Sequence, residues 1–202
     1  MIHPDTSLKF LNPLIGSGIF ATQFIPKGTL TYVKDSLEID LSPNQYLLNN
    51  EVMRQIIDKY SYINEKGHYI ISWDQAKYIN HSCEPNTIST GYGFEFAIRD
   101  IQPGEEITDD YGLFNLEQGF SCACGSPSCR KKILPEDLDM LQDYWDKKIL
   151  PALKNISRVP QPLVKFMDET SLREIEDYLN GSLPYKSVSH LRFRKNEKMH
   201  EL

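Results

Sequence analysis

The sequence predicts a mainly β fold with short helices, followed by a helical extension at its C-terminal end. Three observations lead to this prediction. Short β-rich runs separated by turn residues fill positions 18–110, and the four cysteines fall in two separate stretches. Helical spacing of apolar residues dominates after Lys132. We therefore expect a main domain at residues 1–115, a cysteine-rich segment at 116–132 and the extension at 133–202.

The β-rich runs are separated by recognisable turns. Residues 18–22 lead through a Pro-Lys-Gly turn into a second run at 29–33. Large apolar residues recur at every second position in 94–98, which is the period of a half-buried strand. A Pro-Gly turn then precedes another short strand at 106–108.

One short helix is expected within the main domain. The tetrapeptide Ser-Pro-Asn-Gln at 42–45 has the spacing of a capping box, with proline at the first helical position. Apolar residues between 52 and 60 then recur on one helical face.

The extension has helical spacing in two parts. A proline and two acidic residues at 135–137 open the first part, whose apolar residues recur through Ile149 until Pro151 ends it. The second begins at about Ser171 with another capping-box spacing. We expect these helices to cap the main domain or to form a homodimer interface, and the basic residues within 192–198 to form a mobile or docking tail.

The composition is that of an ordinary globular protein. Of 202 residues, 40% are hydrophobic and 25% are charged, with a formal net charge of −6. This charge argues against direct nucleic-acid binding, which needs clustered lysine and arginine. Acidic pairs at 105–106 and 109–110 suit a basic peptide better, or simply aid solubility. With neither a secretory leader nor a long apolar run, we expect a soluble intracellular protein, cytoplasmic or nuclear, with reduced thiols and no membrane contact.

The cysteines predict a structural zinc site. Cys122, Cys124 and Cys129 form a C-x-C-x4-C pattern, one thiolate short of a closed tetrahedral site, and Cys83 is the remaining thiol. Ordering residues 116–131 costs roughly 1–2 kcal/mol each in backbone entropy. This segment has few apolar groups, whereas a structural zinc contributes roughly 10–16 kcal/mol. We therefore expect Cys83 to lie beside the cluster; free thiols in a flexible loop are the alternative.

Several motifs, taken in order, resemble one family. The segment from Gly16 to Ala21 and a Pro-Lys-Gly turn precede Asn-His-Ser-Cys-Glu-Pro-Asn at 80–86, then Gly-Glu-Glu-Ile-Thr-Asp-Asp-Tyr-Gly at 104–112 and the cysteine pattern. Together they resemble the SET-domain protein lysine methyltransferases that carry a post-SET zinc module. The resemblance implies a SET-domain fold of small curved β-sheets, in which the segments around residues 80 and 111 pass through each other as a pseudoknot. It also implies S-adenosylmethionine as methyl donor and a protein lysine as acceptor.

The resemblance implies particular roles for single residues. It places the methyl donor against two motif segments, with a catalytic tyrosine near the transferred methyl group. Phe120 would pack on the adenine or belong to the core, and the asparagine and histidine of the second motif have structural roles as their alternatives. The donor-binding residues implied are Gly16, Ser17, Gly18, Ile19, Asn80, His81, Tyr111 and Phe120.

The chemistry of Tyr111 can also be argued from first principles. A lysine amine with a pKa near ~10.4 is neutral about once in a thousand or less at neutral pH, and only the neutral form attacks. Holding the reacting atoms in line supplies roughly 7–11 kcal/mol, so positioning outweighs acid–base help. We expect Tyr111 to orient the substrate first and to accept a proton second. Simple packing is the alternative.

Two positions depart from the family pattern. Tyr32, a second candidate catalytic residue that would line the lysine channel, stands in Tyr-Val-Lys-Asp, where the family often has Tyr-x-Gly-Glu; strand packing is its alternative role. Asp109 stands two residues before Tyr111, where an aromatic residue is common and influences how many methyl groups are added. A carboxylate there would hydrogen-bond the substrate amine, so the sequence does not define the methylation state.

The leading functional hypothesis is therefore a protein-lysine N-methyltransferase that acts on a lysine-containing protein or peptide, with histones as one candidate class. The alternative is a non-catalytic, zinc-stabilised peptide-binding module of the same fold. Tyr111 and the Asn80-His81 pair favour catalysis.

Overall fold

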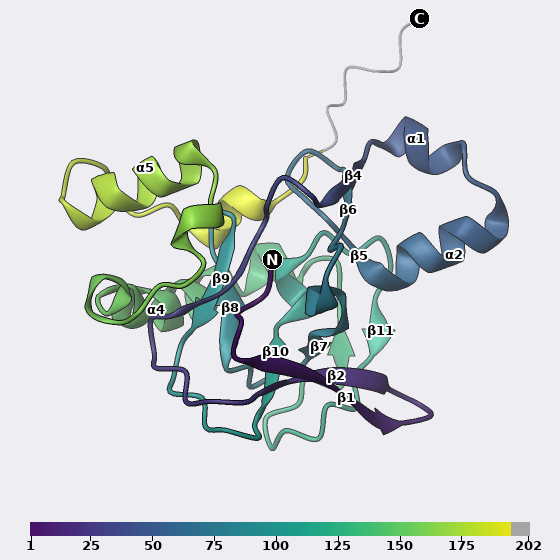
Figure 1. The fold of residues 1–202 in the computed structure, drawn as a ribbon. Coiled ribbons are helices and arrows are strands. Elements are labelled where there is room, and N and C mark those ends of the chain that lie inside the picture. Colours follow the sequence, from purple (N-terminus) through teal and green to yellow (C-terminus); the bar gives the residue numbers. More distant parts are fainter. Residues whose placement is uncertain (195–202) are drawn as a thin grey trace, which may run out of the picture.

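The computed structural model describes residues 1–194 as several small β-sheets with helices at two sides (Figure 1). This arrangement confirms the predicted mainly β class with short helices. The strands are β1 (Thr6–Asn12), β2 (Gly16–Ala21), β3 (Leu30–Val33), β4 (Ile39–Leu41), β5 (Ser61–Ile63), β6 (Tyr69–Ile71), β7 (Asn80–His81), β8 (Thr87–Ser89), β9 (Phe94–Ala97), β10 (Glu106–Asp109), β11 (Phe120–Ser121) and β12 (Lys132–Ile133). The α-helices are α1 (Pro43–Leu47), α2 (Glu51–Tyr60), α3 (Asp137–Met140), α4 (Gln142–Leu153) and α5 (Glu169–Leu179). Short 3-10 helices lie at η1 (Gln75–Tyr78), η2 (Tyr111–Leu113), η3 (Ile156–Arg158), η4 (Val164–Phe166) and η5 (Val188–Leu191).

The first sheet, ordered β1-β2-β10-β7, brings two distant motif segments together. Strand β7 runs parallel to β10, with Asn80 opposite Thr108 and His81 opposite Asp109. Strand β2 pairs with β1 and β10, and β3 pairs with β9. The two runs predicted to be joined by a turn therefore enter different sheets. Their partners lie far away in the sequence, where local turn signals give no information.

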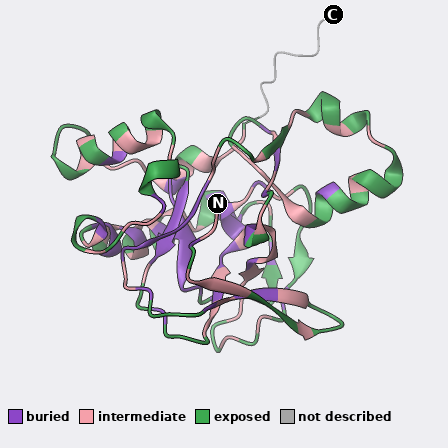
Figure 2. Cartoon of the chain, in the orientation of Figure 1, coloured by how far each residue is buried: buried purple, intermediate pink, exposed green. Residues whose placement is uncertain are grey.

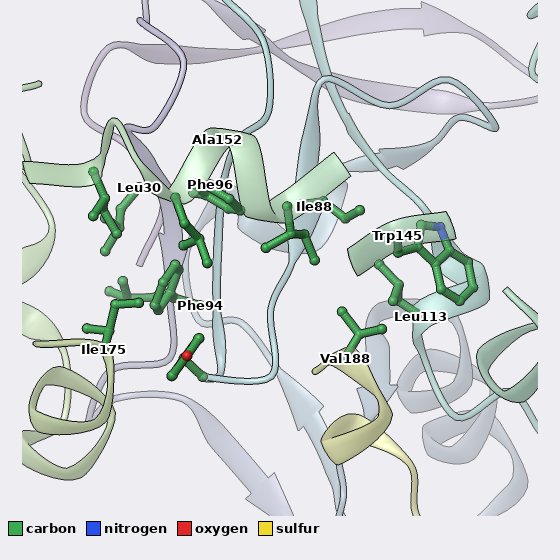
Figure 3. Packing of buried hydrophobic residues seen from close by; sticks show 14 of the residues in the cluster. Leu30, Ile88, Phe94, Phe96, Leu113, Trp145, Ala152, Ile175 and Val188 are labelled. Atoms are coloured by element: carbon green, nitrogen blue, oxygen red, sulfur yellow. The ribbon is translucent and has the colours of Figure 1, made fainter. Parts of the chain in front are cut away.

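The second sheet, ordered β3-β9-β8, separates the core from the site. On one face Leu30, Phe96 and Ile88 lie opposite one another and join a cluster with the C-terminal helices (Figure 3). On the other face Tyr32 and Ser89 flank Glu95. All four residues of β9 are buried, so the expectation of a half-buried strand was wrong. Both faces are covered, as the purple of β8 and β9 in Figure 2 shows.

The third sheet, ordered β4-β6-β5, adjoins α1 and α2 on the side of the molecule away from α4 and α5 (Figure 1). The capping box at Ser42 is present as predicted, with Gln45 as its partner. Of the apolar face predicted for α2, Ile57 is buried whereas Val52 and Ile56 are exposed.

The C-terminal extension packs on the second sheet and shares its core. Trp145 is fully buried there, together with Ile88 and Leu113 (Figure 3). The extension therefore caps the main domain, while its role in a homodimer stays a prediction. No helix among the described residues is long and apolar enough to span a membrane.

The elements of the extension differ from expectation in three details. The first predicted helix is divided into α3 and α4, and Pro151 lies inside α4 rather than ending it. Helix α5 begins two residues before Ser171, because Asp168 accepts the Ser171 N–H as its cap. Arg192 is held by an ion pair with Asp139 at 3.0 Å, so it is not part of a mobile tail. The basic residues predicted at 195 and 198 lie outside the described part of the chain.

Candidate functional site

A cavity of about 580 Å³ lies between the end of α2, strand β5, η1 and the segment 114–120. We call it the tyrosine cavity, because Tyr32, Tyr62 and Tyr111 all line it. Phe120 is also in its lining, as are the carboxylates of Glu95 and Asp109. Of the residues predicted from the sequence, the cavity thus brings together Tyr32, Tyr111 and Phe120.

Tyr111 begins the 3-10 helix η2, two residues after β10, and is fixed by contacts with the β7 segment. Its hydroxyl donates to the carbonyl of Ile79 at 2.6 Å, and its backbone N–H donates to Nδ1 of His81 at 3.1 Å. Burial raises the pKa of Tyr111, and the charge of Asp109 raises it further. The hydroxyl therefore keeps its proton at neutral pH, which suits an orienting group better than a base.

Tyr32 and Tyr62 complete the aromatic lining. The Tyr32 hydroxyl donates to Glu38 at 3.1 Å and accepts from Ser72 at 3.3 Å. Burial raises the pKa of Tyr32 well above its usual value, so it also remains a neutral hydroxyl. Tyr62 stacks on Phe114 with ring centroids 5.4 Å apart. Tyr62 was missed from the sequence, since one tyrosine among eleven carries no local signal.

Two buried carboxyl groups lie beside these tyrosines. Asp109 is fully buried; it accepts from the Ser89 hydroxyl at 2.8 Å and from the Asp110 backbone N–H at 2.6 Å. Burial raises the pKa of Asp109 to about 7. Glu95 is also buried, and burial followed by the charge of Asp109 raises its pKa well above the usual value. Glu95 was missed because the alternating pattern of its strand indicated a solvent-facing position.

The other predicted donor-binding residues lie on β2 and β7, which flank β10 in the first sheet, and they do not line the tyrosine cavity. The Asn80 amide donates to the Ser17 carbonyl at 3.1 Å and to Glu106 at 2.8 Å, which ties the strands together. A Cβ on Gly18 would lie 2.9 Å from that amide nitrogen. The close approach of the Asn80 side chain to the β2 backbone therefore requires glycine at position 18. The Ile19 side chain is fully buried in the core. Donor contact through this backbone stays a prediction.

The structure places Cys83 beside the cysteine cluster. The sulfur atoms of Cys83 and Cys122 are 3.8 Å apart. Two thiolates that are each about 2.3 Å from a tetrahedral zinc lie about 3.8 Å from one another, so this donor set fits the ion. Two backbone N–H groups also face the sulfurs, that of Cys83 toward Cys124 at 3.5 Å and that of Arg130 toward Cys83 at 3.4 Å.

Two residues, His81 and Cys129, are candidates for the fourth ligand, and their hydrogen bonds differ. His81 Nε2 lies within 4.8 Å of the sulfurs of Cys83, Cys122 and Cys124, whereas the Cys129 sulfur faces the Cys122 carbonyl at 3.5 Å. His81 Nδ1, however, accepts the Tyr111 N–H, so in the neutral ring Nε2 carries the proton. That N–H points at the Cys83 sulfur 3.3 Å away and cannot bind a metal. We therefore keep Cys129 as the fourth predicted ligand, with His81 as a donor to the Cys83 thiolate.

A buried ion pair joins the cysteine segment to the site. Arg130 directly follows Cys129 and contacts both carboxylate oxygens of Asp110, at 2.8 and 2.5 Å. Trp145 of the extension donates to the same carboxylate at 3.0 Å. Sequence reasoning missed this network, because its members come from three separate segments.

Small sheets, paired motif segments and a tyrosine-lined cavity beside a cysteine cluster define a protein of the SET-domain class. Residues 16–112 match the family model described as "SET domain". Residues 16–112 therefore form a SET domain, which confirms the resemblance found in this part of the sequence.

Named relatives agree with this assignment. The "Histone-lysine N-methyltransferase ash1" of Drosophila melanogaster is 34% identical over 90 residues, covering 34% of this chain and 4% of the relative. The "Histone-lysine N-methyltransferase, H3 lysine-4 specific" of Schizosaccharomyces pombe is 30% identical over 125 residues, covering 56% of this chain and 13% of the relative. This chain thus spans a small part of both. Among solved structures, the methyltransferase domain of the human histone-lysine N-methyltransferase SETMAR is similar, at 21% identity and a TM-score of 0.45, covering 66% of this chain and 58% of that one.

Proposed function

We propose that this protein is a protein-lysine N-methyltransferase that uses S-adenosylmethionine as methyl donor. The observation that carries the proposal is the placement of the Tyr111 hydroxyl in a cavity lined by Tyr32 and Tyr62. An aromatic cavity with a few convergent polar groups suits the aliphatic stem and polar tip of a lysine side chain. The SET-domain match at residues 16–112 supports the same function.

Tyr111 acts by orienting the substrate amine. Its proton is committed to the Ile79 carbonyl, so its oxygen presents lone pairs to an incoming N–H group. Its backbone is fixed by His81, which limits its movement. Such positioning is the larger contribution to catalysis, at roughly 7–11 kcal/mol.

The donor would be held by the β2 and β7 segments of the first sheet and by Phe120. When bound, S-adenosylmethionine supplies an electrophilic methyl group. The residues present fit it: the space around Gly16 is open where a side chain would otherwise stand, and the partly exposed Phe120 ring offers a surface for a planar base. Phe120 meets the His81 ring edge-on, with centroids 6.1 Å apart.

A zinc ion at Cys83, Cys122, Cys124 and Cys129 would be structural. It would fix the segment that carries Phe120 and thereby close the site. We propose the same division as the sequence suggests, with the SET domain at 1–115, the post-SET segment at 116–132 and the helical extension at 133–202.

We propose a lysine-containing protein as the substrate, with histones as the first class to test and the nucleus as the corresponding location. The two relatives described above are named histone-lysine N-methyltransferases. The net charge of −6 favours a basic partner protein.

A labelled methyl-transfer assay on histones and on host-cell proteins tests the proposal, with target lysines mapped by mass spectrometry. Tyr111→Phe should slow transfer about a hundredfold or more, because the orienting hydroxyl is lost. Tyr144→Phe is the matched control, since Tyr144 lies exposed on α4 outside the cavity. Transfer unchanged by Tyr111→Phe would refute the mechanism. Donor binding without any transfer would favour the peptide-binding module.

A further inference from the structure

Two acidic side chains meet at one wall of the tyrosine cavity. Glu95 lies on β9 between Tyr32 and Ser89 on the neighbouring strands, and Asp109 comes from β10. The Ser89 hydroxyl donates to Asp109 at 2.8 Å. Asp109 is therefore linked to the residue that lies opposite Glu95 on β8. We call Glu95 and Asp109 the carboxylate pair.

Among residues 1–194 no lysine or arginine forms an ion pair with the carboxylate pair, and the Met1 ammonium, whose charge lowers the pKa of Glu95, is held by Asp35 and Glu38. Glu95 Oε2 is buried and has no hydrogen-bond partner among residues 1–194. The Arg130 guanidinium is engaged by Asp110. The lysines that line the cavity, Lys59 and Lys77, lie over the rings of their neighbouring tyrosines. A buried carboxylate without a partner is costly, and such groups persist where a ligand supplies the partner.

We propose that the carboxylate pair is the receptor for the substrate ε-ammonium group and selects lysine by its methylation state, so that monomethyl-lysine is the main product. This inference rests on the proposed function. An unmodified ammonium offers three N–H donors to the oxygens of the pair, whose ionised form its positive charge favours, and each added methyl group removes one donor. Trimethyl-lysine offers none, and its methyl groups would face two oxygens and the Ser89 hydroxyl. Product release therefore becomes easier after the first transfer.

The pair also explains how the amine is made neutral. Burial raises the pKa of Asp109 and of Glu95, so a buried carboxylate accepts a proton from the bound ammonium more readily than an exposed one. The freed nitrogen lone pair then forms the bond to the methyl carbon, and the electron pair of the broken carbon–sulfur bond stays on sulfur. The proton leaves to water when the product departs.

Side-chain analogues test recognition without any need for turnover. Binding of n-butylammonium and of butyltrimethylammonium is measured by chemical-shift titration of the full chain. The wild type should bind the primary ammonium at least about tenfold more tightly, since charge-assisted hydrogen bonds are lost with the trimethyl form. Glu95→Gln and Asp109→Asn should each bring this ratio close to one, and Ser89→Ala should lower it partly. Glu176→Gln, an equal charge change on the exposed side of α5, should leave it unchanged.

Product analysis supplies the second measurement. Acid hydrolysates of methylated proteins should contain mainly monomethyl-lysine with the wild type and a larger share of dimethyl- and trimethyl-lysine with Asp109→Asn. Wild-type selectivity near one, or selectivity unchanged in both carboxylate variants, overturns the inference. If the inference is overturned in this way but the wild type still transfers methyl groups, the proposed function stands. If the wild type binds the primary ammonium selectively but transfers no methyl group, the proposed function is refuted and the inference about recognition stands. The titration spectra also report whether each variant is folded.

Discussion

Arg130 forms a two-pronged ion pair with Asp110, the residue directly before Tyr111 in the chain. The Asp110 side chain is fully buried, and that of Arg130 is 21% exposed. The pair therefore joins the residue after the last cysteine to the residue before Tyr111.

Removal of Arg130 should be strongly destabilising. Arg130→Met leaves the buried Asp110 carboxylate without its main partner, which typically costs about 3–5 kcal/mol. Arg99→Met is the matched control, because Arg99 pairs with Glu105 on the surface at 2.7 Å and such pairs contribute about 0–1 kcal/mol. Urea unfolding measures both. Equal losses in the two variants would contradict the central role of the buried pair.

Zinc content should distinguish Cys129 from His81. We expect about one zinc per chain in the wild type and strongly reduced zinc in Cys83→Ser and Cys129→Ser, because each removes a thiolate ligand. His81→Gln should retain the metal, since His81 donates to a thiolate rather than binding the ion. Elemental analysis after dialysis measures the content. Loss of zinc in His81→Gln together with retention in Cys129→Ser would reverse the ligand assignment.

The stability of Glu95→Gln should depend on pH in a defined direction. The pKa of Glu95 is raised by burial above its usual 4.5, so this carboxyl favours folding below about pH 4.5 and loses that contribution as pH rises toward the folded-state value. Glutamine cannot ionise. The variant should therefore have a higher melting temperature than the wild type at pH 8 and a similar one at pH 4. Each kcal/mol of difference in the free energy of unfolding corresponds to about 2–4 °C in melting temperature for a chain of this size. Thermal unfolding followed by circular dichroism tests this; a less stable variant at pH 8 would contradict it.

The extension should be needed for folding of the main domain. Trp145→Ala removes a fully buried side chain that also donates to Asp110, and we expect a loss of about 3–5 kcal/mol. Leu179→Ala, at the exposed end of α5, should cost less than about 1 kcal/mol. Denaturant unfolding compares the two. If Trp145→Ala left the stability of the second sheet unchanged, the extension would be a separate unit.

The sequence predicted the parts of the site that depend on ordered motifs. Asn80, Cys83 and Tyr111 were found because their neighbours form recognisable patterns, and the family match confirms that order. Glu95 escaped, since an acidic residue between two phenylalanines has the pattern of a half-exposed strand. The fact that both faces of β9 are covered follows only from long-range packing, which a local pattern does not contain.

Element boundaries were predicted less well for related reasons. Pro151 was expected to end a helix, yet α4 continues to Leu153 with Ala152 and Leu153 buried against the core. Tertiary burial thus outweighs the local preference. Strand β1 was not predicted at all, because most of its residues are exposed or half-buried and its position depends on pairing with β2.

The contacts of Asp110 also impose an order on biosynthesis. The residues matched by the SET-domain model, including Tyr111, are synthesised before Arg130 and Trp145. A nascent chain that ends soon after Tyr111 holds residues 16–112 but lacks the two side chains that contact the Asp110 carboxylate. The contacts around Asp110 are therefore completed only after synthesis has passed Trp145.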